Sequence, residues 1–131
     1  MDMITRVRIS LLFEALTFIG ASLVHFGVLV HGYEHDKARI AEGVIAAVLL
    51  AGLIVSLVRS DWTAEAGVAA QGFALLGTLV GLFTIIVGVG PRTVPDLVYH
   101  GAIIAVLGWG LKIAVEGTTS EATRLVPGAG R

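Results

Sequence analysis

The sequence predicts an all-α integral membrane protein, a bundle of four transmembrane helices. Hydrophobic residues make up 56% of the chain and charged residues only 15%, a balance outside the range of soluble globular domains. The hydrophobic residues are concentrated in four runs, each long enough for a helix to cross a hydrocarbon core about 30 Å thick. Short segments containing charged residues, glycine or proline separate the runs, as turns between membrane-spanning helices require.

The first two predicted spans cover about residues 9–30 and 40–58. The first span carries Glu14 and His25 in a mainly apolar run, and the polar segment HGYEHDKAR separates it from the second span. The second span ends before Arg59 and Asp61, whose charges need water.

The third and fourth predicted spans cover about residues 66–89 and 97–115. The third span is rich in glycine, and the GxxxG pair that begins at Gly77 allows another helix backbone to approach closely. Pro95 and Asp96 precede the fourth span and are typical of the first turn of a helix. We therefore expect the third helix to pack inside the bundle and the fourth to begin near Pro95.

Basic residues in the short flanks predict the orientation, because cytoplasmic flanks are enriched in Lys and Arg. The side that holds both termini has the larger set: Arg6, Arg8, Arg59, Lys112, Arg124 and Arg131. The other side has Lys37, Arg39 and Arg92. Both termini are therefore expected in the cytoplasm, with residues 1–116 forming one domain in the plasma (inner) membrane. The polar remainder, residues 117–131, is expected to be a disordered cytoplasmic tail.

Composition and missing motifs exclude several classes of function. The net charge is −1 and the basic residues are scattered, so no basic stripe indicates nucleic-acid binding. The chain has no cysteine, which excludes iron–sulfur clusters, thiolate zinc sites and thiol redox chemistry. It also lacks a phosphate-binding loop and a nucleophile elbow. No enzymatic activity is therefore predicted, and the lipid bilayer is the one certain partner.

A comparison of the second span with the fourth at an offset of 58 residues indicates an internal repeat. Three glycine pairs keep the same order along the two segments: Gly32 with Gly90, Gly43 with Gly101, and Gly52 with Gly110. The same offset aligns Glu42 with His100, and an offset of 57 aligns Glu14 with Gln71. The sequence therefore predicts a tandem duplication of a two-helix hairpin.

The first span has a polar face formed by Glu14 and His25. These residues are eleven positions apart, which is close to three helical turns, so they lie on one stripe. An unpartnered carboxyl or imidazole in hydrocarbon costs a few kcal/mol or more, so this face is expected to point into the bundle. Two interpretations of Glu14 stay open: a neutral carboxyl hydrogen-bonded to Gln71, or a proton carrier.

His25, Glu42 and His100 are expected to converge in the outer half of the bundle. Two imidazoles and a carboxylate are suited to holding a divalent metal or haem and to relaying protons. They are equally suited to forming a structural hydrogen-bonded cluster, and no local motif decides among these interpretations. His31 and His35 are expected to be solvated loop histidines, with metal gathering as the alternative.

The segment FEALTFIG, with Glu14 in the first of four short helices, resembles the small multidrug resistance transporters. That resemblance implies a carboxylate that binds protons and cationic drugs in turn. The chain departs from the family in lacking the aromatic residues that line the family's site on later helices. It also departs in aligning Glu42 with a histidine, His100.

Three functions are compatible with these patterns. The first is movement of protons or a small solute through a polar path formed by Glu14, Gln71, Glu42, His100 and His25. The second is a redox subunit that binds haem or a metal through His25, His100 and Glu42. The third is a non-catalytic accessory subunit that docks a partner on its glycine-rich third helix, in a homodimer or a larger membrane complex.

Overall fold

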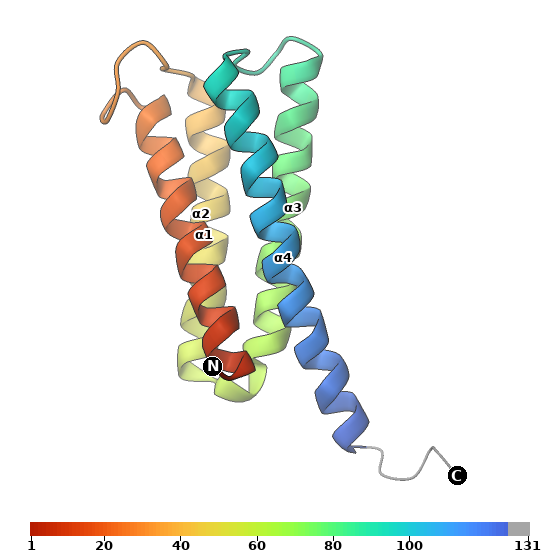
Figure 1. Cartoon of the computed structure of the whole chain (residues 1–131). Coiled ribbons are helices and arrows are strands. Elements are labelled where there is room, and N and C mark those ends of the chain that lie inside the picture. The colour runs from red at the N-terminus through yellow and green to blue at the C-terminus, as the bar shows by residue number, and fades with distance from the viewer. Residues whose placement is uncertain (126–131) are drawn as a thin grey trace.

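The computed structural model confirms an all-helical bundle of four long helices (Figure 1). The helices are α1 (Met3–His25), α2 (Asp36–Val58), α3 (Thr63–Ile86) and α4 (Val94–Leu125), with a short 3-10 turn, η1 (Ser60–Trp62), between α2 and α3. The structure describes the backbone of residues 1–125 and the side chains of residues 1–120. Each long helix contains a stretch that is long and apolar enough to cross a membrane, as expected of a multi-pass membrane protein.

The helices alternate in direction, so the connections are divided between two ends (Figure 1). The α1–α2 and α3–α4 loops lie at one end, here called the two-loop end. The N-terminus, η1 and the last described turn of α4 lie at the other, here called the terminal end. α1 packs mainly on α2, and α3 packs on both α2 and α4. Which end faces the cytoplasm stays a prediction.

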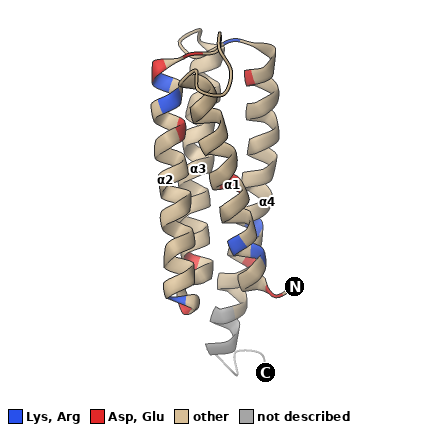
Figure 2. Cartoon of the chain, turned by 90° about the vertical axis from the view of Figure 1, so that its left-hand side faces the viewer, with Lys and Arg blue, Asp and Glu red and all other residues tan. Residues whose placement is uncertain are grey.

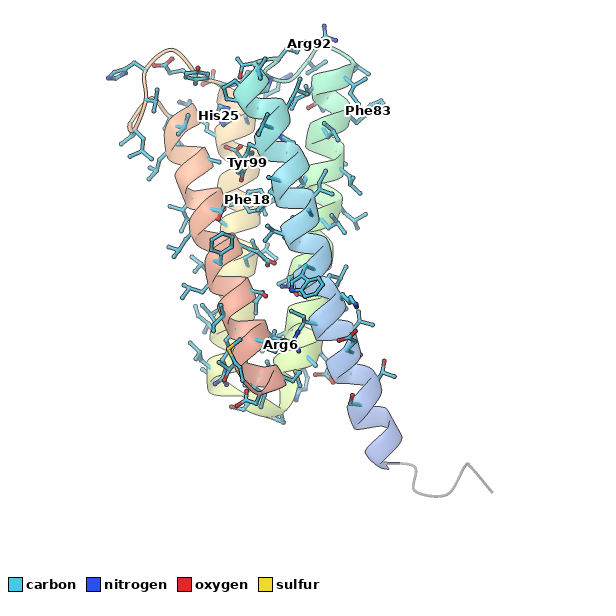
Figure 3. The ribbon with its side chains drawn as sticks, viewed as in Figure 1. Arg6, Phe18, His25, Phe83, Arg92 and Tyr99 are labelled. Atoms are coloured by element: carbon cyan, nitrogen blue, oxygen red, sulfur yellow. The ribbon has the colours of Figure 1, made fainter. Side chains whose placement is uncertain are left out.

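Most charged residues lie near the two ends of the bundle, and few lie along the middle of the helices (Figure 2). Large apolar side chains are exposed on the middle of the helices, including those of Phe13, Leu76 and Trp109. Figure 3 shows Arg92 at the two-loop end and Arg6 near the terminal end. This pattern matches a bundle whose sides contact lipid and whose ends contact water.

Two helices end earlier than predicted because glycines with positive φ close them. α1 was expected to reach residue 30 and α3 residue 89, but Gly27 (φ 73°) and Gly88 (φ 86°) follow the last helical turns. In both places the amide of the next valine bonds to the carbonyl five residues earlier. This arrangement is the Schellman motif, which satisfies the last carbonyls of a helix and stops it.

The last helix is longer than predicted. Residues 117–125, expected to belong to a disordered tail, continue α4 as helix. Near the start of this extension, the hydroxyls of Thr118 and Ser120 donate to the carbonyls of Val115 and Glu116, one turn back. Residues 126–131 of the predicted tail lie outside the described residues.

The centre of the bundle is a packed apolar layer. Phe18, Leu49, Ile103 and Leu107 are among its buried side chains, each no more than 2% exposed. Small residues such as Ala74 on α3 allow the helices to approach closely around them. The layer separates two groups of buried polar residues, one toward each end. The predicted duplication of the hairpins stays a prediction.

Candidate functional site

The buried acidic, imidazole and amide side chains form two separate groups, whereas the buried hydroxyls of Ser56 and Thr63 bond to each other near the terminal end. The first, here called the Glu14–Gln71 pair, lies in the half of the bundle nearer the terminal end. The second, here called the histidine–carboxylate cluster, consists of His25, Glu42, Asp96 and His100 at the two-loop end. The predicted five-residue polar path is therefore divided. Among the described residues, no hydrogen bond connects the two groups.

The division follows from the spacing on α1. Glu14 and His25 lie about 16 Å apart along the helix axis, from their separation of eleven residues. Phe18 lies on the same face between them and is buried, and Figure 3 labels it below His25. The edge of Tyr99 packs against this ring, with the centroids 6.2 Å apart. The rings of Phe18 and Tyr99 thus occupy the space that a continuous polar path from Glu14 to His25 would need.

The Glu14–Gln71 pair is closely packed. Nε2 of Gln71 donates to both carboxyl oxygens of Glu14 at 3.1 Å, and both side chains are fully buried. The predicted hydrogen bond between these residues is therefore present. Gly110 on α4 faces the pair, and a Cβ at this position would clash with Nε2 of Gln71 and Oε1 of Glu14. The pair fills its space and depends on a glycine for room.

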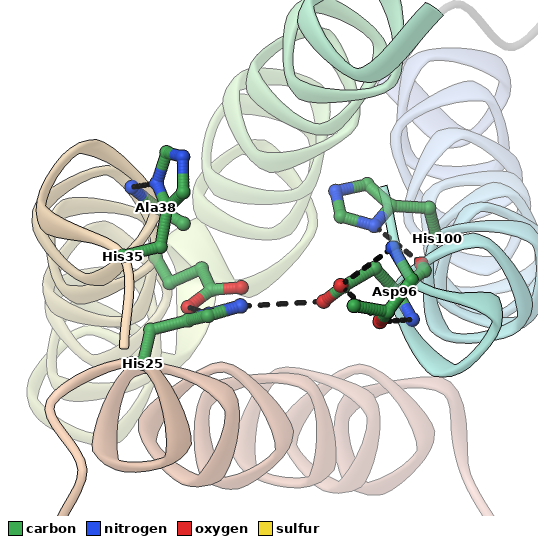
Figure 4. A network of polar contacts seen from close by, with 7 residues as sticks. His25, His35, Ala38, Asp96 and His100 are labelled. Atoms are coloured by element: carbon green, nitrogen blue, oxygen red, sulfur yellow. Dashed lines mark hydrogen bonds and ion pairs between the residues drawn. The ribbon is translucent and has the colours of Figure 1, made fainter. Parts of the chain in front are cut away.

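His25 is the centre of the histidine–carboxylate cluster (Figure 4). Its Nδ1 lies 2.7 Å from Oε2 of Glu42, and its Nε2 lies 3.2 Å from Oδ1 of Asp96. His25 is the last residue of α1, Glu42 is in the second turn of α2, and Asp96 is in the first turn of α4. All three residues are less than 9% exposed.

Local structure fixes both Asp96 and His25. Thr93 precedes α4, and its backbone amide donates to Oδ2 of Asp96 at 3.3 Å while the amide of Asp96 donates to the Thr93 hydroxyl. This reciprocal capping box holds Oδ2 and leaves Oδ1 directed at His25. The backbone amide of His35 donates to the carbonyl of His25, which fixes the end of α1 against the start of α2.

The two contacts of His25 require two protons. Each contact is a hydrogen bond only with a proton between the ring nitrogen and the carboxylate oxygen, and a neutral imidazole supplies one proton. The second comes from an imidazolium or from a protonated carboxyl group. With two protons, the three side chains together carry a net charge of −1. The basic side chains Arg39 and Arg92 do not compensate it, because they bind Asp36 and the carbonyls that end α3.

His100 joins the cluster through the backbone. Its Nδ1 lies 2.7 Å from the carbonyl oxygen of Asp96. Because a carbonyl only accepts, Nδ1 carries a proton, and Nε2 of the neutral ring is an acceptor. Nε2 is directed toward α3, where a Cβ at Gly81 would lie 3.3 Å away.

The predicted meeting of His25, Glu42 and His100 is therefore only partly correct. His25 and Glu42 are in contact, but Asp96 occupies the place expected for His100, whose ring turns toward α3. Within residues 1–120, no group of three His, Asp or Glu side chains is arranged to hold a metal ion. The geometry thus gives no support to the metal set of His25, His100 and Glu42, because both nitrogens of His25 already face carboxylates. Haem binding stays a prediction.

A cavity of about 170 Å³ adjoins the cluster between α2, α3 and α4. Glu42, Thr78 and His100 line its interior, together with apolar side chains such as Phe18. The lining extends to the exposed Lys37 at the two-loop end, so the cavity is reached from that end. Neither Glu14 nor Gln71 contributes to it.

The loop histidines do not belong to a three-residue metal set among the described residues either. The side chain of His31 is 91% exposed, with Nδ1 3.6 Å from a carboxyl oxygen of Glu34. Backbone hydrogen bonds, from Glu34 itself and from Gly32, lower the pKa of the Glu34 carboxyl below its ordinary value. His35 caps α2, since its Nδ1 accepts from the amide of Ala38 at 3.2 Å.

Asp96 is the site residue that the sequence did not identify, because it was interpreted only as the start of a helix. One pattern indicates its second role. Asp96 and His100 are separated by four residues, so they lie on the same face of a helix. A carboxylate one turn before an inward-facing histidine is therefore expected to point into the bundle as well.

Comparison with known proteins finds no relative. No protein-family description, no curated protein and no solved structure matches this chain. The resemblance to the small multidrug resistance transporters thus rests on a short segment and the number of helices. The function must be argued from the site itself.

Proposed function

We propose that this chain binds and exchanges protons at the histidine–carboxylate cluster and moves protons across the membrane through this exchange, together with a small solute where one is bound. The supporting observation is that both ring nitrogens of the buried His25 face carboxylate oxygens, those of Glu42 and Asp96. A net charge of −1 in an apolar interior favours the binding of one more proton or of another small cation. Reversible cation binding is the chemistry to which this cluster is best suited.

The cavity supplies the route for this exchange. It joins Glu42 and His100 to the two-loop end, which the charge bias predicts to be the outer side of the plasma (inner) membrane. The apolar layer around Phe18 and Leu107 separates the cluster from the terminal end. Transport therefore requires a second state in which the helices around this layer rearrange.

The predicted duplication of the hairpins is compatible with this proposal. If the two hairpins are a duplication, Glu42 and His100 hold equivalent positions on two walls of the cavity. Within the described part of the chain, no observation favours the redox-subunit, accessory-subunit or homodimer alternatives.

Proton flux through reconstituted protein tests the proposal. Liposomes loaded with a pH-sensitive dye are given a potassium gradient and valinomycin, which drive protons inward wherever a pathway exists. The wild-type chain is expected to acidify the liposomes well above the protein-free rate, and His25→Leu and Glu42→Gln are expected to abolish the excess. Glu14→Gln is the matched control, because it makes the same change at a buried carboxyl outside the cavity.

A different result assigns a structural role to the cluster. Each variant is first checked for helical content and a monodisperse elution profile, so that loss of flux is not confused with loss of folding. If folded His25→Leu conducts protons as fast as the wild type, or if the wild type never exceeds protein-free liposomes, the proposal is wrong.

A further inference from the structure

In its interior, the cavity beside the cluster presents hydrogen-bond acceptors, and the donors among its lining side chains, those of Lys37 and His35, lie at its opening at the two-loop end. The hydroxyl of Thr78 donates to the carbonyl of Ala74 at 2.7 Å, and that of Thr84 donates to the carbonyl of Gly81 at 2.7 Å. Both hydroxyl oxygens therefore have only lone pairs left to offer. Thr78 and Thr84 lie on the α3 wall of the cavity.

The opposite walls have the same polarity. On α4, His100 uses its Nδ1 proton on the Asp96 carbonyl, so Nε2 is an acceptor beside Gly81. On α2, Glu42 uses Oε2 on His25 and keeps Oε1 as an acceptor. Helices α2, α3 and α4 thus each contribute at least one acceptor to one cavity.

We infer that this cavity binds a small primary ammonium ion with a short apolar group. An ammonium has three N–H donors and no acceptor, the complement of the groups around it. Its charge balances the net charge of −1 on His25, Glu42 and Asp96. An anion or a carbonyl ligand would instead bring further lone pairs against the same acceptors. The inference rests on the proposed function, because it assigns a ligand class to the same site.

Size and lining define the rest of the ligand. The cavity measures about 170 Å³, and an apolar protein cavity of about 150 Å³ is large enough for benzene. Phe18, Ile45 and Ile85 provide apolar contacts next to the acceptors. An amine the size of benzylamine therefore fits, with its ammonium at Glu42 and its ring against these side chains.

Lys37 is the opposing charge at the opening. Its side chain is exposed and belongs to the lining at the two-loop end, so it repels a cation that enters. His35 lies beside it, with Nδ1 already occupied by the Ala38 amide. The carboxylate on α3, that of Glu65, is in the first turn of that helix at the terminal end and does not line the cavity. Removing the charge of Lys37 is therefore expected to strengthen cation binding.

Calorimetric titration of the full chain in detergent with benzylamine tests the inference. Benzylamine is expected to bind saturably at one site per chain. Benzyltrimethylammonium, which has the charge but no N–H, and benzyl alcohol, which has no charge, are each expected to bind at least tenfold more weakly. Glu42→Gln is expected to weaken benzylamine binding at least tenfold, and Glu14→Gln to leave it unchanged. Lys37→Gln, a change at the surface, is expected to strengthen it about twofold or more, by removing a repulsive charge.

Several outcomes would overturn the inference. Equal binding of benzyl alcohol and benzylamine would show a merely apolar cavity, and unchanged binding in folded Glu42→Gln or weaker binding in Lys37→Gln would contradict the charge argument. No saturable binding in the wild type, together with proton flux that depends on Glu42, would remove the inference and leave the proposed function standing. Absence of both binding and flux would remove both.

Discussion

Glu14 and Glu42 are both glutamates buried in membrane helices, yet their surroundings differ in three respects. Glu14 has one neutral partner, Gln71, whereas Glu42 contacts His25, which also contacts a second carboxylate, Asp96. Glu14 is tightly enclosed against Gly110, whereas Glu42 lines a cavity. The apolar layer separates Glu14 from the two-loop end, whereas the cavity connects Glu42 to that end.

Burial of a carboxyl group therefore does not by itself mark a functional site. A buried acid that pairs with an amide and fills its space has one hydrogen-bonded arrangement, here with the Oε1 of Gln71 left without a partner among the described residues. A buried acid that shares protons with other titratable groups, next to a cavity, has more than one protonation state within reach. We therefore assign packing to the Glu14–Gln71 pair and ion exchange to the histidine–carboxylate cluster.

The largest effect is expected from filling the space at the Glu14–Gln71 pair. Gly110→Ala places a methyl group too close to the side-chain ends of Gln71 and Glu14 for either to stay in place, and both side chains are fully buried, so the free energy of unfolding should fall by about 3 kcal/mol, the upper end of the usual cost of overpacking. Unfolding in mixed detergent micelles, followed by circular dichroism, measures this loss.

Two alanine substitutions are the controls for this prediction. Gly108→Ala has nothing within 4 Å of the new Cβ and should be neutral or slightly stabilising. Gly81→Ala, beside the cavity, places its Cβ 3.3 Å from Nε2 of His100 and should cost less than about 1 kcal/mol because the ring has room to move. Equal losses at Gly110 and Gly81 would remove the contrast between the two regions.

The next largest effect is expected at the Glu14–Gln71 pair, where it tests whether the pair is structural or functional. Glu14→Leu leaves the buried amide of Gln71 without its partner and should cost about 1–3 kcal/mol. The double variant Glu14→Leu with Gln71→Leu removes both polar groups and should return to within about 1 kcal/mol of the wild type. Proton flux should persist in the folded double variant. A double variant as unstable as the sum of the single ones, or one without flux, would show that the pair does more than pack.

The smallest effect is expected at Tyr99. Its hydroxyl is buried and has no hydrogen-bond partner, while its ring packs edge-on against Phe18. Tyr99→Phe keeps the ring and removes the unsatisfied group, so the free energy of unfolding should stay unchanged or rise by about 1 kcal/mol. A loss of more than that, in the same unfolding assay, would show that the hydroxyl has a partner in the membrane.

Much of the fold could be predicted from the sequence, because hydrophobic run length determines where helices cross a membrane. The ends of α1 and α3 could not, since Gly27 and Gly88 stop these helices inside apolar runs. Apolar residues continue beyond both glycines, so composition alone places the ends too late. The extension of α4 was missed for the opposite reason, because a polar helix outside the bundle has no hydrophobic signal.

The candidate site could be predicted in part. Glu14, Gln71, His25 and Glu42 all point inward and each has a hydrogen-bond partner, because an unpaired polar group in an apolar interior is costly. Among the described residues, Oε1 of Gln71 and the hydroxyl of Tyr99 are the exceptions. The partner of each group could not be deduced from depth alone. His100 and Asp96 lie one turn apart on α4, and the capping of Asp96 by Thr93 decides which of them reaches His25.

Infrared difference spectroscopy shows which glutamate carries the exchangeable proton, because it detects the carbonyl band of protonated carboxyl groups. Spectra of the purified chain in detergent are recorded between alkaline and acidic buffer for the wild type, Glu42→Gln and Glu14→Gln. The account predicts that a buried carboxyl band appears on acidification in the wild type, persists in Glu14→Gln, and is lost or shifted in Glu42→Gln. A titrating band that vanishes with Glu14→Gln and survives Glu42→Gln would contradict the account, because it would place the exchangeable proton on the closed side of the apolar layer.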